Sequence, residues 1–194
     1  NSAFGVIMGT SGDVILVDFN QFEAVTTATS PMDAAGAARN ADMLTYDTAI
    51  ALPASLYCEH TPFSAIGGGV SGVPVQVDNG SNTDRYGFYV SSADSLHHAF
   101  VSVASVLTAD VSVAGALVNQ TTYKLGGTYT TNYCNAFKSG AAGTADTAVA
   151  IPTGLNRIVV GNSSSGAGAA FGGVKNVRIL QGVLSDAVMQ VVTT

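Results

Sequence analysis

The sequence predicts an all-β, antiparallel fold that closes with a short C-terminal helical turn, and three observations predict it. Runs of β-branched and aromatic residues recur along the 194 residues, and turn signals rich in Gly, Asn, Asp and Ser separate them. Only 10% of the residues are charged, so Ser, Thr, Asn and Gly must form much of the surface, which suits all-β proteins. Many short strands with frequent turns indicate a sandwich or a barrel.

The N-terminal part contains a predicted hairpin followed by a linker. Residues 4–8 and 14–19 are β-rich runs on either side of a Gly-Thr-Ser-Gly turn. Residues 26–38 are rich in Thr, Ala, Ser and Gly and show no periodicity. We therefore expect 1–25 to be a hairpin or docking segment, or the end of an upstream β-sandwich domain. A linker at 26–38 then leads into one domain at 39–194.

Strand signals fill the remainder of the chain, and a helix signal ends it. The predicted strands are, in order, 43–46, 55–62, 73–78, 85–91, 97–106, 110–118, 121–130, 133–138, 147–151, 157–160 and 174–180. The one persuasive helix is 185–192. Ser185 is a suitable N-cap, and Asp186 places negative charge in the first turn, where the helix dipole favours it.

Charge and cysteine content exclude several classes of function. The net charge is −6 with only seven basic residues, so we expect neither nucleic acid nor anionic membrane as a partner. Polar residues interrupt every stretch of about 18 residues, so no transmembrane helix is expected. Cys58 and Cys134 are far apart and outside any CxxC pattern. A disulfide would be one interpretation, and two buried free thiols are the simpler one.

From Arg39 onward the chain resembles concanavalin A-like lectin/glucanase (laminin G-like) domains of the form found in tailed-phage structural proteins and tail fibres. The opening Arg39-Asn40-Ala41-Asp42 and the closing Leu184-Ser185-Asp186-Ala187 are similar to the family's ends. The intervening pieces match in order at 54–59, 77–80, 85–90, 123–129, 151–161 and 177–180. The chain departs from the glucanase branch because it lacks that branch's Glu-x-Asp-x-x-Glu strand.

This resemblance implies a concanavalin A-like jelly-roll sandwich in a bacteriophage virion protein, such as a tail fibre, head fibre or decoration protein. It implies a virion-surface location, other virion proteins as partners, and a homo-oligomer such as a trimer. The expected role is non-catalytic attachment to the host surface through weak carbohydrate binding. The alternatives are a purely structural capsid or tail component and a polysaccharide-degrading enzyme.

Two groups of residues are candidates for binding. Sugar sites combine aromatic rings for stacking with amides for hydroxyl groups, and the candidates for such a site are Tyr86, Tyr89, Asn132, Tyr133 and Asn135. No cofactor is required, but related domains often hold calcium near one rim. The oxygen-rich loop that could hold it carries Asp78, Asn79, Asn82 and Asp84. A plain turn stabilised by Asp and Asn side chains is the simpler interpretation of this loop.

The hypothesis that the chain is an enzyme finds little support in the sequence. Glycoside hydrolysis needs two facing carboxyl groups, and Glu59 is the only Glu in the lectin-like region. Cys58 and His60 share one face of a predicted strand, but nothing supplies a third group. We therefore predict no catalytic residues.

Overall fold

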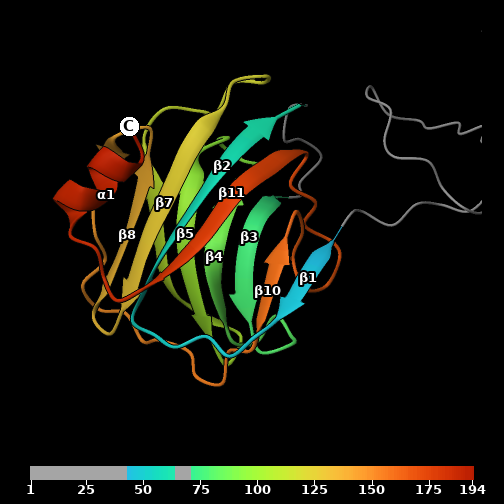
Figure 1. Ribbon diagram of the computed structural model, residues 1–194, viewed down its shortest axis with the longest axis vertical. Coiled ribbons are helices and arrows are strands. Elements are labelled where there is room, and N and C mark those ends of the chain that lie inside the picture. Colours follow the sequence, from blue (N-terminus) through green and yellow to red (C-terminus); the bar gives the residue numbers. More distant parts are fainter. Residues whose placement is uncertain (1–42, 64–70) are drawn as a thin grey trace, which may run out of the picture. The chain divides into compact units, whose positions relative to one another are not determined.

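The computed structural model describes residues 43–63 and 71–194. These residues form two antiparallel β-sheets packed face to face, with one short helix (Figure 1). The predicted hairpin at 4–8 and 14–19 and the linker at 26–38 lie outside the described residues. The all-β sandwich with a terminal helix is confirmed. No helix in the described part is long and apolar enough to cross a membrane.

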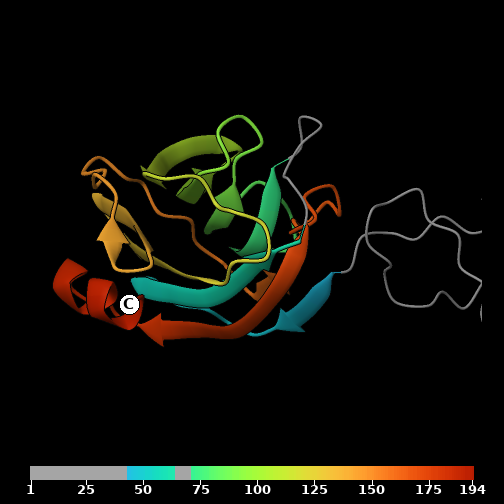
Figure 2. The same ribbon diagram turned by 90° about the horizontal axis from the view of Figure 1, so that it is seen from above.

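Six strands form one sheet in the order β1-β10-β3-β4-β5-β6, and five form the other in the order β11-β2-β7-β8-β9. The bounds of the first sheet's strands are β1 Leu44–Asp47, β10 Arg157–Val160, β3 Gly72–Asp78, β4 Arg85–Val90, β5 His97–Val103 and β6 Val106–Val113. The bounds of the second sheet's strands are β11 Gly172–Gln181, β2 Ala54–Pro62, β7 Tyr123–Thr130, β8 Tyr133–Lys138 and β9 Ala141–Ala142. Figure 2 shows the two curved layers from above.

The core lies between the sheets because alternate residues of each strand point inward. Its largest fully buried side chains include Tyr86 and Phe88 of β4 and Leu125 and Tyr129 of β7. The Tyr129 hydroxyl donates a 2.9 Å hydrogen bond to the Gly87 carbonyl across the sandwich. Cys58 and Cys134 are both buried free thiols, as the simpler interpretation predicted.

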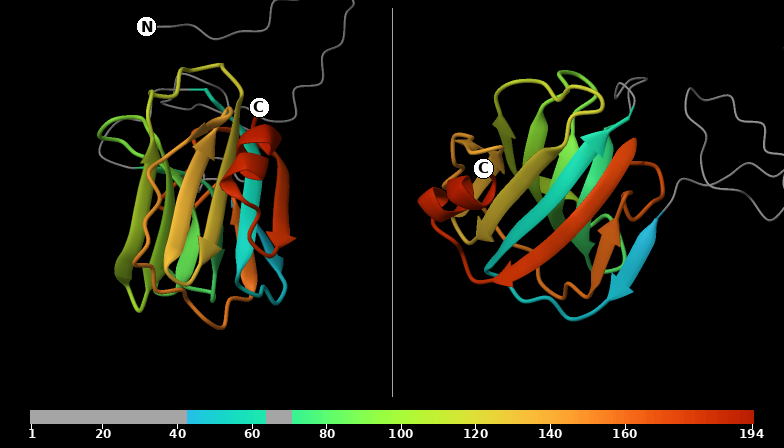
Figure 3. Two further views of the ribbon diagram at one scale, coloured as in Figure 1. Left: turned by 90° about the vertical axis from the view of Figure 1, so that its left-hand side faces the viewer. Right: turned by 45° about the horizontal axis from the view of Figure 1, so that its top comes forward.

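The predicted helix is confirmed as α1, Asp186–Val192. Ser185 is its N-cap, with the side-chain oxygen accepting from the Val188 amide. The helix lies against the outer side of the five-stranded sheet beside β8 (Figures 1 and 3). Its anchor is Met189, which is fully buried. A Cβ at Gly126 of β7 would lie 2.5 Å from the Met189 methyl group and 2.9 Å from Thr193 Cγ2, so these side chains of the helix end pack directly over the glycine.

Two stretches differ from the predicted strands. The hairpin between β5 and β6 turns at Ala104 and Ser105, whose φ angles are 50° and 68°. The predicted strands at 97–106 and 110–118 therefore have the wrong boundary. Two-residue turns with positive φ at both positions favour Asn and Gly, so the Ala-Ser sequence gives no turn signal.

The predicted strand at 147–151 is also wrong. In this region only Asp146 makes a bridge, to Cys134, and its side chain folds back to accept from the Ala148 amide.

Candidate functional site

The structure does not bring the predicted sugar-binding residues together. Tyr86 is fully buried in the core, so this prediction is wrong: its ring cannot stack on a sugar at the surface. Asn132 is exposed and sits in the β7–β8 turn with a φ of 60°. Its backbone amide donates to the Val149 carbonyl. Tyr133 and Asn135 lie on the other sheet from Tyr89.

Tyr133 and Asn135 hold the start of helix α1. The Tyr133 hydroxyl donates to Asp186 Oδ1 at 2.6 Å, and Asn135 Nδ2 donates to Asp186 Oδ2 at 2.8 Å. Burial, followed by this hydrogen bond to Asp186, raises the pKa of Tyr133 to about 12. Asn135 is only 1% exposed. These two polar side chains therefore position the helix, and Asn135 in particular is not available to a ligand.

The predicted calcium loop is filled by its own hydrogen bonds. Asp78 accepts from the Gly80 amide, from Gln76 Nε2 and from Arg157 Nε, the last at 2.8 Å. The other oxygens of the loop accept from further protein donors: Asn79 from Ser81, Asp84 from Asn79, Thr83 and Ala104, and Asn82 from Gln76, Arg85 and Ser164. Calcium is bound by oxygens that are free to coordinate it. With two guanidinium groups already among the donors, these residues do not fit a calcium ion, and the loop matches the simpler interpretation of a turn.

Tyr89 is the one predicted aromatic residue that reaches the outer face of the six-stranded sheet. Its ring stacks on the His98 ring, with centroids 4.4 Å apart and planes 21° apart. Its hydroxyl donates to Asp110 Oδ2 at 2.7 Å. His98 Nδ1 is 2.8 Å from Asp110 Oδ1. We call Tyr89, His98 and Asp110 the aromatic cluster. Three neighbouring strands, β4, β5 and β6, carry one member each.

The electrostatics of the aromatic cluster fix the Tyr89 hydroxyl as a donor. Burial and the hydrogen bond to Asp110 both raise the pKa of Tyr89. Burial alone would raise the pKa of Asp110, but the hydrogen bonds from His98 and Tyr89 outweigh it and hold that pKa below its usual value. Asp110 is therefore an ionised acceptor near neutral pH. It holds both rings in one orientation while its side chain remains partly exposed.

A polar network continues from the aromatic cluster across the same face. Tyr89 packs edge-on against Phe100, at 5.7 Å between centroids, and the Arg85 guanidinium lies 5.2 Å from the centre of the Phe100 ring. Arg85 donates to Gln76, Gln76 donates to Asp78, and Asp78 pairs with Arg157. An ordered row of aromatic and hydrogen-bonding groups therefore reaches from β6 to β10, with Phe100, Gln76 and Asp78 buried within it.

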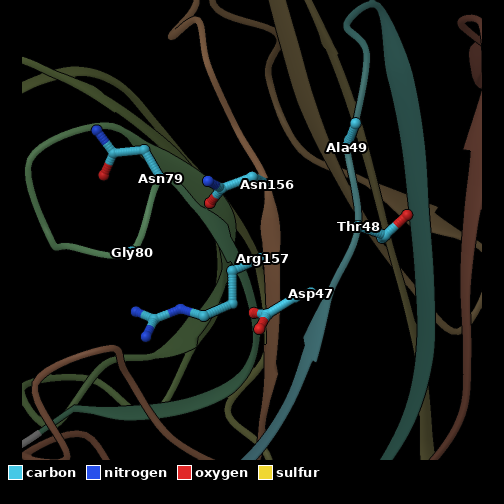
Figure 4. Close-up of a pocket in the computed structure, with 7 residues that line it drawn as sticks. All are labelled: Asp47, Thr48, Ala49, Asn79, Gly80, Asn156 and Arg157. Atoms are coloured by element: carbon cyan, nitrogen blue, oxygen red, sulfur yellow. The ribbon is translucent and has the colours of Figure 1, made fainter.

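A pocket of 510 Å³ lies at the far end of this row. Its lining comes from three segments: Asp47 to Ala49 after β1, Asn79 and Gly80 in the β3–β4 loop, and Asn156 and Arg157 at the start of β10 (Figure 4). Carboxylate, hydroxyl, amide and guanidinium groups share this space. Such a mixture of donors and acceptors suits hydroxyl groups.

The predicted site residues did not include His98, Phe100, Asp110 or Arg85. The alternation on two strands could have found Arg85, His98 and Phe100. Arg85 and Tyr89 share one face of β4 because they are four residues apart, and His98 and Phe100 share one face of β5.

Glu59, the excluded catalytic candidate, lies on the other sheet, where it accepts from Tyr57 and Asn176 and pairs with Lys175. Cys58 and His60 are buried, and His60 is bonded to the Ala170 carbonyl.

The fold belongs to the class of lectin-like β-sandwiches. Polar and aromatic residues lie on the outer face of its six-stranded sheet. No known protein family matches the sequence, and no curated protein matches it. Solved structures do resemble it. The sialidase CBM40 of Ruminococcus gnavus bound to α2,3-sialyllactose is 14% identical, with 73% of this chain and 83% of that chain covered and a TM-score of 0.57.

Two further structures agree with this class. The heptameric SAP-like pentraxin from Limulus polyphemus is 14% identical, with 81% of this chain and 84% of that chain covered and a TM-score of 0.55. Domains LG4-5 of the mouse laminin α1 chain are also 14% identical, with 79% and 44% covered and a TM-score of 0.54. At this identity the similarity shows the fold. The chain shares the concanavalin A-like, laminin G-like sandwich that its sequence resembles.

Proposed function

We propose that this chain is a non-catalytic carbohydrate-binding module whose sugar platform is Tyr89. The observation that carries the proposal is the aromatic cluster: a tyrosine ring held by stacking on His98 and by its bond to Asp110. A ring fixed before binding loses little conformational entropy when a sugar stacks on it. Asp110, whose side chain is partly exposed, supplies carboxylate oxygens beside the ring for the sugar's hydroxyl groups.

The fold also supports carbohydrate binding. One of the similar structures is described as a carbohydrate-binding module in complex with sialyllactose. The pocket beside Arg157 extends the polar surface beyond one sugar ring, so an oligosaccharide suits the face better than a monosaccharide. The proposed setting, which rests on the sequence resemblance alone, is the surface of a bacteriophage virion. There the module would attach to host glycans as part of a homo-oligomer, with other virion proteins as neighbours.

The test is a glycan array with the full chain, followed by titration of the best ligand against three variants. Tyr89→Ala should weaken binding at least tenfold, which corresponds to about 1.4 kcal/mol, because the stacking surface is lost. Tyr89→Phe should keep most of the affinity, since the ring remains. Tyr46→Ala is the matched control, because Tyr46 is 65% exposed on β1, at the edge of the same sheet.

Three outcomes would contradict the proposal. Failure to bind any glycan, together with a stable oligomer, would favour the structural alternative. Unchanged affinity in Tyr89→Ala would place the sugar elsewhere on the molecule. Release of reducing ends from a bound polysaccharide would overturn the non-catalytic part and favour the enzyme.

A further inference from the structure

The outer face of the five-stranded sheet gathers cations on a chain whose net charge is −6. The register aligns Lys175 of β11, Glu59 of β2 and Lys124 of β7 in one cross-strand row. The next pair on the same face is Arg178 beside Tyr57, with the guanidinium 5.8 Å from the centre of the Tyr57 ring. We call Lys124, Lys175 and Arg178 the cationic row.

Lys175 and Arg178 are exposed, whereas the cations of the described residues outside the row are buried or half-buried and bonded to other protein groups. Arg157 is paired with Asp78, and Arg85 donates to Gln76 and Asn82. Lys138 is buried and donates to the carbonyls of Ala114 and Gly115. The cationic row is thus where the described part of the chain offers positive charge to solvent.

Within the cationic row, the head groups remain open to a ligand. Lys175 has a side chain that is 64% exposed, and its ammonium lies 3.3 Å from Glu59 Oε2. Arg178 is exposed, and its guanidinium lies over the Tyr57 ring. Glu59 offsets one of the three positive charges, so the cationic row and Glu59 together carry a net charge of +2. Helix α1 lies toward β8, and β2 and β11 are uncovered by it (Figure 1).

The spacing of the row indicates the shape of the ligand. Adjacent strands are about 4.8 Å apart, so the outer two of the three strands are about 10 Å apart. Glu59 stands between the two lysines in this row, so a small anion placed between them would meet the Glu59 carboxylate. An extended polymer with repeated anionic groups can contact both, and can also reach Arg178 further along β11.

We infer that the cationic row binds an acidic polysaccharide, a glycan with repeated carboxylate or sulfate groups. Three cations neutralise too few phosphates for stable nucleic-acid binding on a chain that is acidic overall. Phe63, which is 51% exposed, is the large apolar side chain near the row, beside Gly173 of β11, and vesicle binding is therefore compared directly in the test below. This site is separate from the aromatic cluster, because it lies on the opposite sheet.

The test uses hexagalacturonate as the probe and its methyl ester as the neutral control. The full chain should bind the acid form more tightly than the ester at low salt, and this difference in affinity should shrink steeply as salt rises. Lys175→Gln and Arg178→Gln should each weaken binding about fivefold, the range of one exposed ion pair. Glu59→Gln should strengthen binding by a similar factor. It removes the opposing charge but keeps a side-chain oxygen for Asn176 and Tyr57.

Controls separate this site from the proposed sugar platform and from general charge effects. The effects of Lys175→Gln and Arg178→Gln should persist in a Tyr89→Ala background, since the two sites lie on opposite sheets. Asp94→Asn alters net charge by the same amount as Glu59→Gln, but on the other sheet, so it should not strengthen binding. Far-ultraviolet circular dichroism of each variant confirms the fold.

The inference is overturned if the ester binds as well as the acid, or if Lys175→Gln and Arg178→Gln have no effect. Equal strengthening by Asp94→Asn and Glu59→Gln would also overturn it, since the effect would then be one of overall charge. Tighter binding to phosphatidylglycerol vesicles or to single-stranded DNA than to hexagalacturonate would assign the row to a different partner.

Discussion

Lowering the pH from 7 to 5 should remove about 4 kcal/mol from the free energy of unfolding, because two histidines are buried as neutral rings. Burial lowers the pKa of His97 to about 3 and that of His60 to about 4. Both rings are fully buried, and each has one nitrogen, Nδ1, without a hydrogen-bond partner within the described residues. A proton on either ring would therefore be a poorly compensated buried charge.

The sign and size follow from the difference between folded and unfolded pKa values. In the unfolded chain each histidine titrates near pH 6.5. Above that pH both states are neutral and stability is complete. As the pH falls toward the folded values, the unfolded state binds protons first and gains about 1.4 kcal/mol per histidine per pH unit. At pH 5 this amounts to about 2 kcal/mol for each ring, a large part of the stability of an ordinary domain.

The assay is urea unfolding of the wild-type chain at pH 7, 6 and 5. The variants His60→Gln and His97→Gln are compared with it. Glutamine can still donate toward the Ala170 or Gly126 carbonyl that each histidine faces, and it does not titrate. Each variant should lose about half of the decrease between pH 7 and 5, whatever its own stability at pH 7. The reasoning is refuted if both variants keep the full decrease, or if the wild-type chain is equally stable at pH 7 and 5.

Two further predictions concern the packing of the sandwich. Met189→Ala should lower the free energy of unfolding by about 2–4 kcal/mol, because the fully buried side chain holds helix α1 on the sheet. Val191→Ala, at a position that is 76% exposed on the same helix, is the control, and equal urea midpoints for the two variants would contradict the prediction. Tyr129→Phe should cost about 1–2 kcal/mol, since it leaves the buried Gly87 carbonyl without its donor. An unchanged melting temperature would show that this bond contributes little.

The alternation of side chains along a strand could be predicted from the sequence, and it decides much of the fold. Tyr86 and Tyr89 illustrate both its power and its misuse. They are three residues apart on β4, so they must point to opposite faces. Phe88 and Val90 share the face of Tyr86 and mark that face as the core. Treating both tyrosines as sugar-binding residues ignored this difference.

Other features depend on contacts between distant segments, which no local pattern reveals. Tyr133 and Asn135 look like surface residues until helix α1, about 50 residues later, covers them. The oxygen-rich loop at 78–84 looks like a cation site until Arg157 and Ser164 reach it from the far end of the chain. The aromatic cluster likewise assembles from three strands. The sequence shows each residue type but not the register that brings them together.

The order of strands in the two sheets also governs how the protein is completed during synthesis. Strands β3 to β6 are sequential neighbours, so they can pair while the nascent chain is still growing. Strand β10 lies between β1 and β3, and β11 pairs with β2, which ends at Pro62. Both sheets therefore stay incomplete until β10 and β11 have left the ribosome. Until then, β2 and β3 each present an unpaired edge, the form in which a β-protein is most prone to aggregate.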